Sequence, residues 1–355
     1  MKIASVVGAR PQFVKASRLS RELNKQHNEV LIHTGQHYDK LMSECFFEEL
    51  NIPVPDYNLE IGSGSHACQI AQMLMKLEIV LLKENPDMVL VYGDTNSTLA
   101  GALAAAQVNI PVVHMEAGMR SFDKTMPEEI NRIVSDHLSQ IYFCSTQKAV
   151  DNLAREGIHK EVYLVGDVMV DVLYDNLQMA EESNILFQLN IEKREYYLAT
   201  IHRACNTDNC NNLRAILEAL SELDKPVVLP LHPRTKKAIA TSLPDEFQNS
   251  RIKYIDPVGY IDMLQLEKNA RKILTDSGGI QKEACVLQVP CITLRDTTEW
   301  IETVEQDCNI LVGADKSKII SEANSEKNFP ASVKIFYGDG KASQKISSIL
   351  GQWKK

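Results

Sequence analysis

The sequence predicts an α/β protein built from two doubly wound, Rossmann-like parallel-sheet domains with a cleft between them. Short apolar runs alternate with helical patterns, and those runs are hydrophobic throughout, as are the strands of parallel sheets that helices cover on both faces. The pattern restarts after Asp167, and 355 residues are too many for one typical domain but enough for two. We expect an N-terminal domain over residues 1–167 and a C-terminal domain over residues 168–341.

The first half supports this order element by element. Ile70, Leu74, Leu77 and Leu81 recur at helical spacing, and Pro127 suits the first turn of a helix. The expected strands are 3–7, 30–34, 88–92, 111–115, 140–144 and 162–165. The expected helices are 12–24, 66–83 and 97–107, one that begins at 127 and one that ends near 157.

The second half repeats the alternation, with helices between its strands. The expected strands are 196–200, 227–230, 252–255, 273–275, 291–294 and 309–311.

Composition excludes several classes of protein. The hydrophobic content of 44% and charged content of 24% are those of a globular protein, and the net charge of −9 argues against broad nucleic-acid binding. The N-terminus does not resemble a signal peptide, and no apolar stretch approaches a membrane span. The eight cysteines form no CxxC pair, so we expect neither a zinc site nor a disulfide framework. Several lie in apolar runs, and we expect these to be reduced core thiols of a cytoplasmic protein.

Polar residues follow the apolar strands in both halves. In open parallel sheets, ligands bind outside the carboxyl ends of the strands, so these residues predict one site in the cleft between the two domains. They are Arg10, Asp94, Glu116, His202, His232 and Ser277.

The segment Asp276-Ser277-Gly278-Gly279 joins an expected strand to an expected helix. The first amides of a helix lack intrahelical partners and are partly positive, and glycines let a diphosphate approach the backbone. Glu283, one turn into the helix, could accept hydrogen bonds from vicinal hydroxyls such as those of a ribose. This predicts a nucleotide-diphosphate site; the alternative is an ordinary strand-to-helix turn.

Three carboxylates of the first half are candidate acid/base groups, and each has a plainer interpretation. Asp94 follows a strand, but it could simply cap the next helix. Glu116 directly follows a buried strand, where a carboxylate is costly unless it is paired or used, and Arg120 could be its partner. Glu128 stands in the first turn of a helix, where charge–dipole attraction alone can explain it.

Cationic groups stand at the same strand ends. Arg10 and Lys15 could face an anion or could be solvated charges, whereas two neighbouring strand ends that each carry a histidine and an arginine are less easily dismissed. Those two ends carry His202 with Arg203, and His232 with Arg234. Carboxylates can move a proton on and off a sugar carbon, while cations and helix amides can stabilise a departing nucleotide diphosphate.

Ordered motifs along nearly the whole chain resemble one family. They are the opening Gly8-Ala9-Arg10-Pro11, Tyr92-Gly93-Asp94-Thr95, Glu116-Ala117-Gly118-Met119-Arg120, Pro127-Glu128-Glu129-Ile130-Asn131-Arg132, His202-Arg203, the segment 275–283, Arg295-Asp296-Thr297-Thr298-Glu299, and Tyr337-Gly338-Asp339-Gly340-Lys341-Ala342-Ser343. The chain thereby resembles the non-hydrolysing UDP-N-acetylglucosamine 2-epimerases.

The resemblance implies a glycosyltransferase-B-like fold in which a C-terminal helix, residues 342–355, crosses back to the first domain. It also implies inversion at carbon 2 of a UDP-2-acetamido sugar. The proton at carbon 2 is removed and UDP is eliminated; UDP then adds back to the bound glycal as a proton arrives from the other face. No metal or redox cofactor is implied, and a homodimer is expected.

The resemblance also implies roles for individual residues. Asp94, Glu116 and Glu128 would be the acid/base carboxylates, without saying which is acid and which is base, and His202 would contact the diphosphate or assist its departure. The substrate-binding residues would be Arg10, Lys15, Arg203, His232, Arg234, Met263, Ser277, Gly278, Gly279, Glu283 and Arg295, with Met263 where the family often has an aromatic residue beside uracil.

Some positions depart from the common pattern. Trp300 stands where many members have arginine, and Tyr38-Asp39 follow Gln36-His37 where allosterically activated members have other polar residues, so we do not expect that activation. The opening motif, the segment 92–97 and Thr298-Glu299-Trp300 look more like the branch that acts on UDP-2,3-diacetamido-2,3-dideoxy-glucuronate, for surface polysaccharides such as lipopolysaccharide O-antigen. UDP-N-acetylglucosamine is the alternative substrate.

Three other functions remain open from the sequence. A glycosyltransferase of the same fold would need an acceptor groove, and a hydrolysing epimerase would release free sugar and UDP. A non-catalytic nucleotide-sugar binder would have no use for the carboxylates. A UDP-sugar is the expected partner in each case, with no nucleic acid and no membrane.

Overall fold

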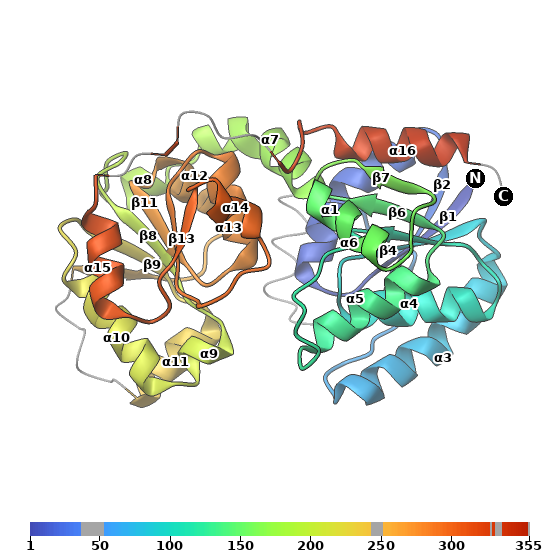
Figure 1. Cartoon of the computed structure of the whole chain (residues 1–355), viewed down its shortest axis with the longest axis horizontal. Coiled ribbons are helices and arrows are strands. Elements are labelled where there is room, and N and C mark those ends of the chain that lie inside the picture. Colours follow the sequence, from blue (N-terminus) through green and yellow to red (C-terminus); the bar gives the residue numbers. More distant parts are fainter. Residues whose placement is uncertain (37–52, 243–250, 327–328, 331–335, 354–355) are drawn as a thin grey trace. The chain divides into compact units, whose positions relative to one another are not determined.

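The computed structural model describes residues 1–36, 53–242, 251–326, 329–330 and 336–353, without the side chains of Arg10 and Ser242 (Figure 1). The chain divides into two compact units. The first comprises Met1–Asp175 together with Phe336–Lys355, and the second comprises Asn176–Ile335. We refer to them as unit 1 and unit 2.

Unit 1 is built on a parallel sheet of seven strands in the order β3-β2-β1-β4-β5-β6-β7. Strand β1 pairs with β2 on one side, where Ile3 lies opposite Glu29, and with β4 on the other, where Ile3 lies opposite Met88. The strands are β1 (Lys2–Val7), β2 (Asn28–His33), β3 (Tyr57–Asn58), β4 (Met88–Tyr92), β5 (Val112–Met115), β6 (Ile141–Cys144) and β7 (Val162–Leu164).

Helices cover both faces of this sheet. The connection from β1 to β2 runs towards one edge of the sheet, and the connection from β4 to β5 runs towards the other. Because such connections are right-handed, helices α1 and α4 lie on opposite faces of the sheet. Helices α3, α4 and α5 pack in a row, and Met73 and Leu77 of α3 are buried against β1, β2 and β4. The helices of this unit are α1 (Arg10–Leu23), α3 (His66–Glu84), α4 (Asn96–Gln107), α5 (Pro127–Leu138) and α6 (Gln147–Arg155), and α7 (Val168–Glu181) begins in unit 1 and ends in unit 2.

The last helix, α16 (Ala342–Gln352), returns to unit 1 and packs against α1 (Figure 1, red beside blue). The Asp171 carboxylate accepts hydrogen bonds from the amides of Ala342 (3.0 Å) and Ser343 (2.7 Å), so α7 supplies the cap for the first turn of α16. The Ser347 hydroxyl donates to the Glu22 carbonyl at the end of α1 (3.2 Å).

Unit 2 is built on a parallel sheet of six strands in the order β10-β9-β8-β11-β12-β13. Its strands are β8 (Tyr197–Thr200), β9 (Val227–Pro230), β10 (Ile252–Ile255), β11 (Lys272–Thr275), β12 (Cys291–Thr293) and β13 (Asn309–Leu311). Its helices are α8 (Ile185–Gln188), α9 (Ala204–Thr207), α10 (Cys210–Ser221), α11 (Pro233–Ser242), α12 (Tyr260–Asn269), α13 (Gly278–Val286), α14 (Ile301–Glu305) and α15 (Lys316–Asn324).

Alternate residues of β8, together with Tyr196 just before it, enter two different cores. Tyr197 and Ala199 pack on the face that α10 and α15 cover, whereas Tyr196 and Leu198 pack on the face that α12 and α13 cover. A strand buried on both faces needs apolar residues at every position, because successive side chains point to opposite sides. This explains the uninterrupted apolar runs in the sequence.

The prediction of two doubly wound parallel sheets is confirmed. The sequence did not indicate β3, which is only two residues long. The strand order reverses between β1 and β4 in unit 1 and between β8 and β11 in unit 2. The carboxyl ends of these strand pairs form the switch points at which such sheets bind ligands. The cleft that we expect between the domains stays a prediction.

Candidate active site

The unit 1 switch point is held together by Gln12 in the first turn of α1. Its side-chain oxygen accepts from the amides of Gly8 (2.8 Å) and Ala9 (2.9 Å), and its Nε2 donates to the Tyr92 carbonyl (2.6 Å). These bonds tie the turn after β1 to the turn after β4. Gly8 lies so close to Ser97 that a Cβ would collide with its hydroxyl, which explains the glycine.

The structure brings Lys15 and Glu116 into a salt bridge at this point, although the two lie far apart in the sequence. The side chain of Lys15 is 10% exposed and that of Glu116 is 12% exposed. Glu116 adopts a left-handed backbone (φ 62°), which residues other than glycine rarely adopt. Such conformations cluster at functional sites, where surrounding contacts hold them in place.

Asp94 lies beside this pair and makes its own ion pair. Arg132 of α5 donates to its Oδ2 (2.6 Å), and Asn131 donates to its carbonyl (2.9 Å). Burial and the nearby Glu116 raise the pKa of Asp94 above its usual value, against the opposing effect of Arg132 and Lys15. A carboxyl with a raised pKa beside a second carboxylate is a common arrangement for proton transfer.

The structure rules out the interpretation of Asp94 as the cap of the helix that follows it. Thr95 is the N-cap of α4, and its hydroxyl accepts from the Thr98 amide (3.3 Å), so Asp94 does not cap that helix. It also corrects the suggestion that Arg120 pairs with Glu116. Arg120 instead binds Asp136 (2.7 Å) and Glu156 (2.6 Å).

Glu128 and Glu129 differ although they are neighbours in α5. Glu129 is buried and accepts hydrogen bonds from the Ser121 and Phe122 amides (2.8 and 3.0 Å) and from Arg132 (3.0 Å). Burial alone would raise the pKa of Glu129, but these bonds hold it below its usual value, so it is a structural anion. Glu128 is exposed at the start of the helix. Arg10 opens α1, but its side chain lies outside the described residues, as do His37, Tyr38 and Asp39.

The unit 2 switch point is organised around Asp276, a fully buried carboxylate directly after β11. It accepts from the amides of His202 and Arg203 (3.0 Å each) and from the Asn206 side chain (3.0 Å). A buried carboxylate is tolerated when several donors satisfy it. Asp276 therefore fixes the turn after β8 relative to β11.

Asp276 also orients the predicted histidine. The Nδ1 of His202 lies 3.2 Å from Asp276 Oδ1, and since a carboxylate only accepts, Nδ1 carries the proton of the neutral ring. Burial and three arginines (203, 234 and 295) lower the pKa of His202, against the opposing effect of Asp276. The His232 ring lies 5.6 Å from the His202 ring, centroid to centroid. His202 is therefore poised to gain a proton when an anion approaches.

Ser277 is the N-cap of α13, and Gly278 and Gly279 form its first turn. A Cβ on Gly278 would lie 2.9 Å from the Trp300 indole nitrogen, so this glycine makes room for a side chain of the protein itself. Trp300 also carries the Lys282 ammonium 4.0 Å above its ring centroid. Trp300 thus places an aromatic ring, with a lysine ammonium over its face, beside the first turn of α13.

The other predicted binding residues of unit 2 lie in varied surroundings. Glu283 is buried and accepts from the Tyr260 hydroxyl (3.2 Å), and Arg295 makes a two-pronged ion pair with Glu299 (3.0 Å for both bonds). Arg234 is paired with Asp208 (2.5 Å) at the surface, and Met263 packs half-buried against the core.

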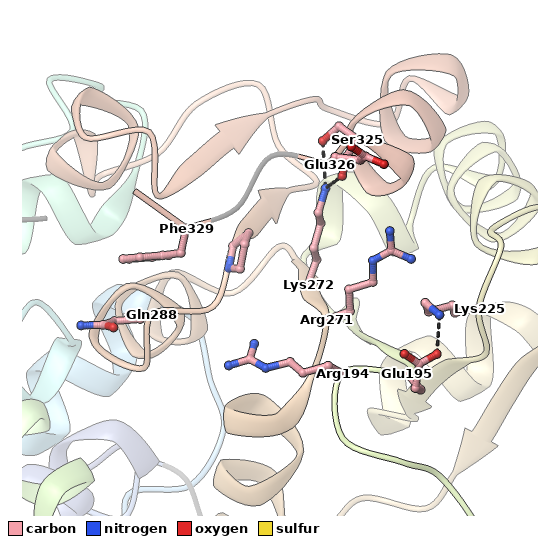
Figure 2. A pocket seen from close by; sticks show the side chains of 10 residues that line it. Arg194, Glu195, Lys225, Arg271, Lys272, Gln288, Ser325, Glu326 and Phe329 are labelled. Atoms are coloured by element: carbon pink, nitrogen blue, oxygen red, sulfur yellow. Dashed lines mark hydrogen bonds and ion pairs between the residues drawn. The ribbon is translucent and has the colours of Figure 1, made fainter. Parts of the chain in front are cut away.

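A pocket of about 780 Å³ lies at the amino ends of the strands of the unit 2 sheet, opposite the switch point (Figure 2). Its cations already have partners. Lys225 binds Glu195, Arg194 donates to the Ala270 carbonyl (2.7 Å), and Lys272 donates to the carbonyls of Glu322 (2.6 Å) and Ser325 (2.7 Å). Because ligands of open parallel sheets bind at the carboxyl ends, we do not place the substrate here.

Several of these organising residues were not predicted from the sequence. From the sequence, Asp276 is expected only as part of a strand-to-helix turn, and Gln12 has no expected role. A polar residue directly after a buried strand was the available signal for Asp276. Among the residues that the structure describes, no group of three His, Cys, Asp or Glu side chains is arranged to hold a metal. Likewise, no helix in the described ranges is both long and apolar enough to cross a membrane.

These two switch points, one rich in carboxylates and one rich in cations, belong to a two-domain α/β protein of the glycosyltransferase-B-like class. The family model described as UDP-N-acetylglucosamine 2-epimerase matches residues 21–351. The chain therefore belongs to the UDP-N-acetylglucosamine 2-epimerase family, a family of isomerases, as its motifs predicted.

Individual relatives agree over nearly the whole chain. A UDP-N-acetylglucosamine 2-epimerase homolog of Methanococcus maripaludis is 53% identical, with 99% of both chains covered. The UDP-2,3-diacetamido-2,3-dideoxy-D-glucuronate 2-epimerase of Pseudomonas aeruginosa is 47% identical, with 99% of this chain and 100% of that protein covered. The crystal structure of Methanocaldococcus jannaschii UDP-GlcNAc 2-epimerase in complex with UDP-GlcNAc and UDP matches with a TM-score of 0.89 at 48% identity, with 99% of both chains covered.

Proposed function

We propose that this protein is a non-hydrolysing UDP-sugar 2-epimerase that inverts carbon 2 of a UDP-2-acetamido sugar. The observation that carries the proposal is the meeting of Asp94, Glu116 and Lys15 at the unit 1 switch point. Two adjacent carboxylates in different environments can divide the work of removing a proton and supplying one.

The proposed reaction proceeds by elimination and re-addition. A carboxylate takes the proton from carbon 2, the carbon 2 electron pair forms the double bond to carbon 1, and the bond from carbon 1 to the UDP oxygen breaks with its electrons going to UDP. UDP then adds back to carbon 1 while carbon 2 is protonated from the other face. No electrons are gained or lost overall, so the reaction needs no redox cofactor.

The surroundings of the two carboxylates suit different roles. Glu116 makes a salt bridge with Lys15, and a carboxylate beside a cation suits a proton acceptor for the gluco substrate. The raised pKa of Asp94 suits a group that carries the proton to the manno face. Glu128 completes the proposed set from the start of α5.

The cationic groups of unit 2 suit the departing UDP. His202, Arg203 and the first turn of α13 would bind the diphosphate, with His232, Arg234 and Arg295 around them, and Glu283 would bind the ribose. Arg10 would bind on the unit 1 side. Charge of this kind stabilises the leaving group as its bond to carbon 1 breaks.

Two sugars are candidates for the substrate. The Pseudomonas relative and the segment Thr298-Glu299-Trp300 favour UDP-2,3-diacetamido-2,3-dideoxy-glucuronate, and with it a role in surface-polysaccharide synthesis. The identity of 53% to the Methanococcus maripaludis protein favours UDP-N-acetylglucosamine. Trp300, with Lys282 over its ring, stands where we expect arginine in many members of the family. We propose that these two residues help to determine which of the two sugars binds.

Proton NMR in deuterated water tests the function. The protein is incubated separately with each sugar, and deuterium at carbon 2, a manno product and no lasting free UDP are expected with one of them. Accumulating free UDP and sugar would instead indicate a hydrolysing epimerase. A lack of exchange with both sugars would contradict the proposal and favour a glycosyltransferase, which an acceptor screen would then test.

A homodimer in the cytoplasm is part of the proposal. Met75, Ile79 and Leu82 recur at helical spacing on α3 and are 70%, 68% and 64% exposed, a stripe that a second copy would cover. The free cysteines in the described part of the chain support a reducing compartment. Light scattering should show a dimer that Ile79→Glu converts to a monomer; a monomeric parent protein would contradict this.

A further inference from the structure

His114 is a fully buried histidine on β5, two residues before Glu116. Its Nδ1 lies 2.7 Å from Asp136 Oδ1, and its Nε2 lies 2.7 Å from the Gly93 carbonyl oxygen. A carbonyl only accepts hydrogen bonds, and so does an ionised carboxylate. Both ring nitrogens must therefore donate, which makes the side chain an imidazolium.

The surrounding charges stabilise this cation. Asp136 of α5 binds His114 through one oxygen; its other oxygen accepts from the Gly118 amide (3.1 Å) and pairs with Arg120 (2.7 Å). Arg120 in turn pairs with Glu156 (2.6 Å). Four groups of alternating charge thus form a chain in which each anion has a cation beside it, as buried charges require.

The pKa values agree with this assignment. Burial alone would lower the pKa of His114, but Asp136 and the Gly93 carbonyl raise it above its usual value. His114 and Arg120 hold the pKa of Asp136 below its usual value against the effect of burial. From β6, burial and Asp136 raise the pKa of Tyr142 to about 12 and also raise that of the Cys144 thiol, so both stay neutral.

The two bonds of His114 act on both candidate acid/base residues. The Gly93 carbonyl belongs to the peptide that leads into Asp94, and Gly93 has a left-handed backbone (φ 63°). The Gly93 amide donates to the Met115 carbonyl (2.9 Å), which belongs to the peptide that leads into Glu116. Strand β5 therefore binds both the amide and the carbonyl of Gly93, and so holds the turn that carries Asp94.

We propose that His114 is a positioning residue for the epimerase reaction, a buried imidazolium that fixes the Asp94 turn against the strand end that carries Glu116. The inference deepens the proposed function and rests on it. His114 does not touch the substrate in this proposal; it acts through the Gly93 carbonyl. A shift of about 1 Å between reacting groups is enough to cost about 100-fold in rate, so such a bond has a measurable effect.

The protonation state can be tested without any activity. In protein labelled with nitrogen-15 at histidine, the His114 ring signals are assigned by their loss in a His114→Gln variant. At about pH 8.5, two pH units above the ordinary histidine pKa, we expect both His114 ring nitrogens to be protonated, whereas free histidine added as a reference reports a neutral ring. A neutral His114 ring at that pH would overturn the inference.

Two substitutions separate the two bonds. The amide nitrogen of glutamine can take the place of Nε2 and keep the bond to Gly93, whereas that of asparagine can take the place of Nδ1 and keep only the bond to Asp136. We expect His114→Asn to lower kcat about 100-fold with little change in KM, and His114→Gln to lower it less than about tenfold. A merely structural role would lower both alike, in proportion to their loss of thermal stability.

Equal kcat values in the two variants, or a loss confined to KM, would overturn the positioning role. If either variant does not fold, the His114 ring signals of the parent protein are assigned by through-bond correlation instead, and their protonation decides the matter. If the parent protein turns over neither sugar, the proposed function fails, whereas the imidazolium at His114 is still confirmed or refuted by its nitrogen signals.

Discussion

The two switch points use buried charge in opposite ways. In unit 1, the carboxylates of Asp94 and Glu116 stay partly open and are held by cations, Arg132 and Lys15. In unit 2, the carboxylate of Asp276 is fully buried, and the side chain of His202, which pairs with it, is 34% exposed. The same sheet topology thus presents carboxylates in one unit and cationic groups in the other, to which our proposal assigns acid/base chemistry and anion binding.

The largest effect should come from the unit 1 carboxylates. We expect Glu116→Gln and Asp94→Asn each to lower kcat by about 10²–10⁴-fold, because proton transfer at carbon 2 is lost, while UDP binding by calorimetry stays nearly unchanged. Glu78→Gln, on the exposed surface of α3, is the matched control and should keep full activity. Normal turnover in both site variants would show that the acid/base groups lie elsewhere.

The two carboxylate variants should also differ in which of the two sugars, gluco or manno, still undergoes elimination of UDP. If Glu116 accepts the proton of the gluco sugar, Glu116→Gln should still eliminate UDP from the manno sugar, and Asp94→Asn should still eliminate it from the gluco sugar. Release of the glycal, followed by mass spectrometry, reports each direction. The reverse pattern would exchange the two roles.

The next effect concerns the buried anion of unit 2. Asp276→Asn replaces an acceptor with a group that cannot satisfy all the surrounding donors, so we expect the free energy of unfolding to fall by about 2–3 kcal/mol. Asp208→Asn should lower it much less, because the side chain is 60% exposed in its pair with Arg234 and solvent screens such a pair. Chemical denaturation of both variants makes the comparison. Equal losses would mean that Asp276 does not organise the switch point.

A smaller effect is expected at the start of α13. Gly278→Ala places a Cβ against the Trp300 indole nitrogen, so stability should fall by about 1–3 kcal/mol. The double variant Gly278→Ala/Trp300→Phe removes that nitrogen and should recover most of the loss. If stability recovers but UDP affinity by calorimetry does not, the space at Gly278 serves the diphosphate as well. A lack of recovery in stability would contradict the packing explanation.

The smallest effect is a pH dependence of UDP binding. The pKa of His202 is below its usual value in the free protein, and a bound diphosphate would raise it, so the complex would take up a proton. His202 should therefore strengthen UDP binding as the pH falls from its pKa in the complex to its lower pKa in the free protein. The affinity for UDP should rise by up to about tenfold for each pH unit between these two pKa values.

Calorimetry across this pH range measures the effect, and the His202→Asn variant provides the control. UDP itself gains a proton at low pH, and the variant retains that contribution, so the difference between the two proteins isolates His202. Identical slopes would contradict the role of His202 beside the diphosphate.

The sequence predicted the sheets and the strand ends because both depend on local patterns, apolar runs and the polar residues that follow them. It could not predict partners that meet only in the folded chain, such as Lys15 with Glu116 or Gln12 with the Tyr92 carbonyl. It left Asp94 open between a cap and an acid, since only the backbone shows that Thr95 is the N-cap. For Arg120, the suggested partner was wrong because the nearer carboxylates in space come from α5 and the end of α6.

The return of α16 to unit 1 has a consequence for biosynthesis. Ile346 and Leu350 are fully buried, so the N-terminal unit includes apolar surface that only the end of the chain can cover. On the ribosome, unit 2 has its whole sequence available before unit 1 does. The half that is synthesised first is therefore completed after unit 2, and a chain that stops before α16 would have a finished unit 2 attached to a unit 1 in which α16 does not cover α1.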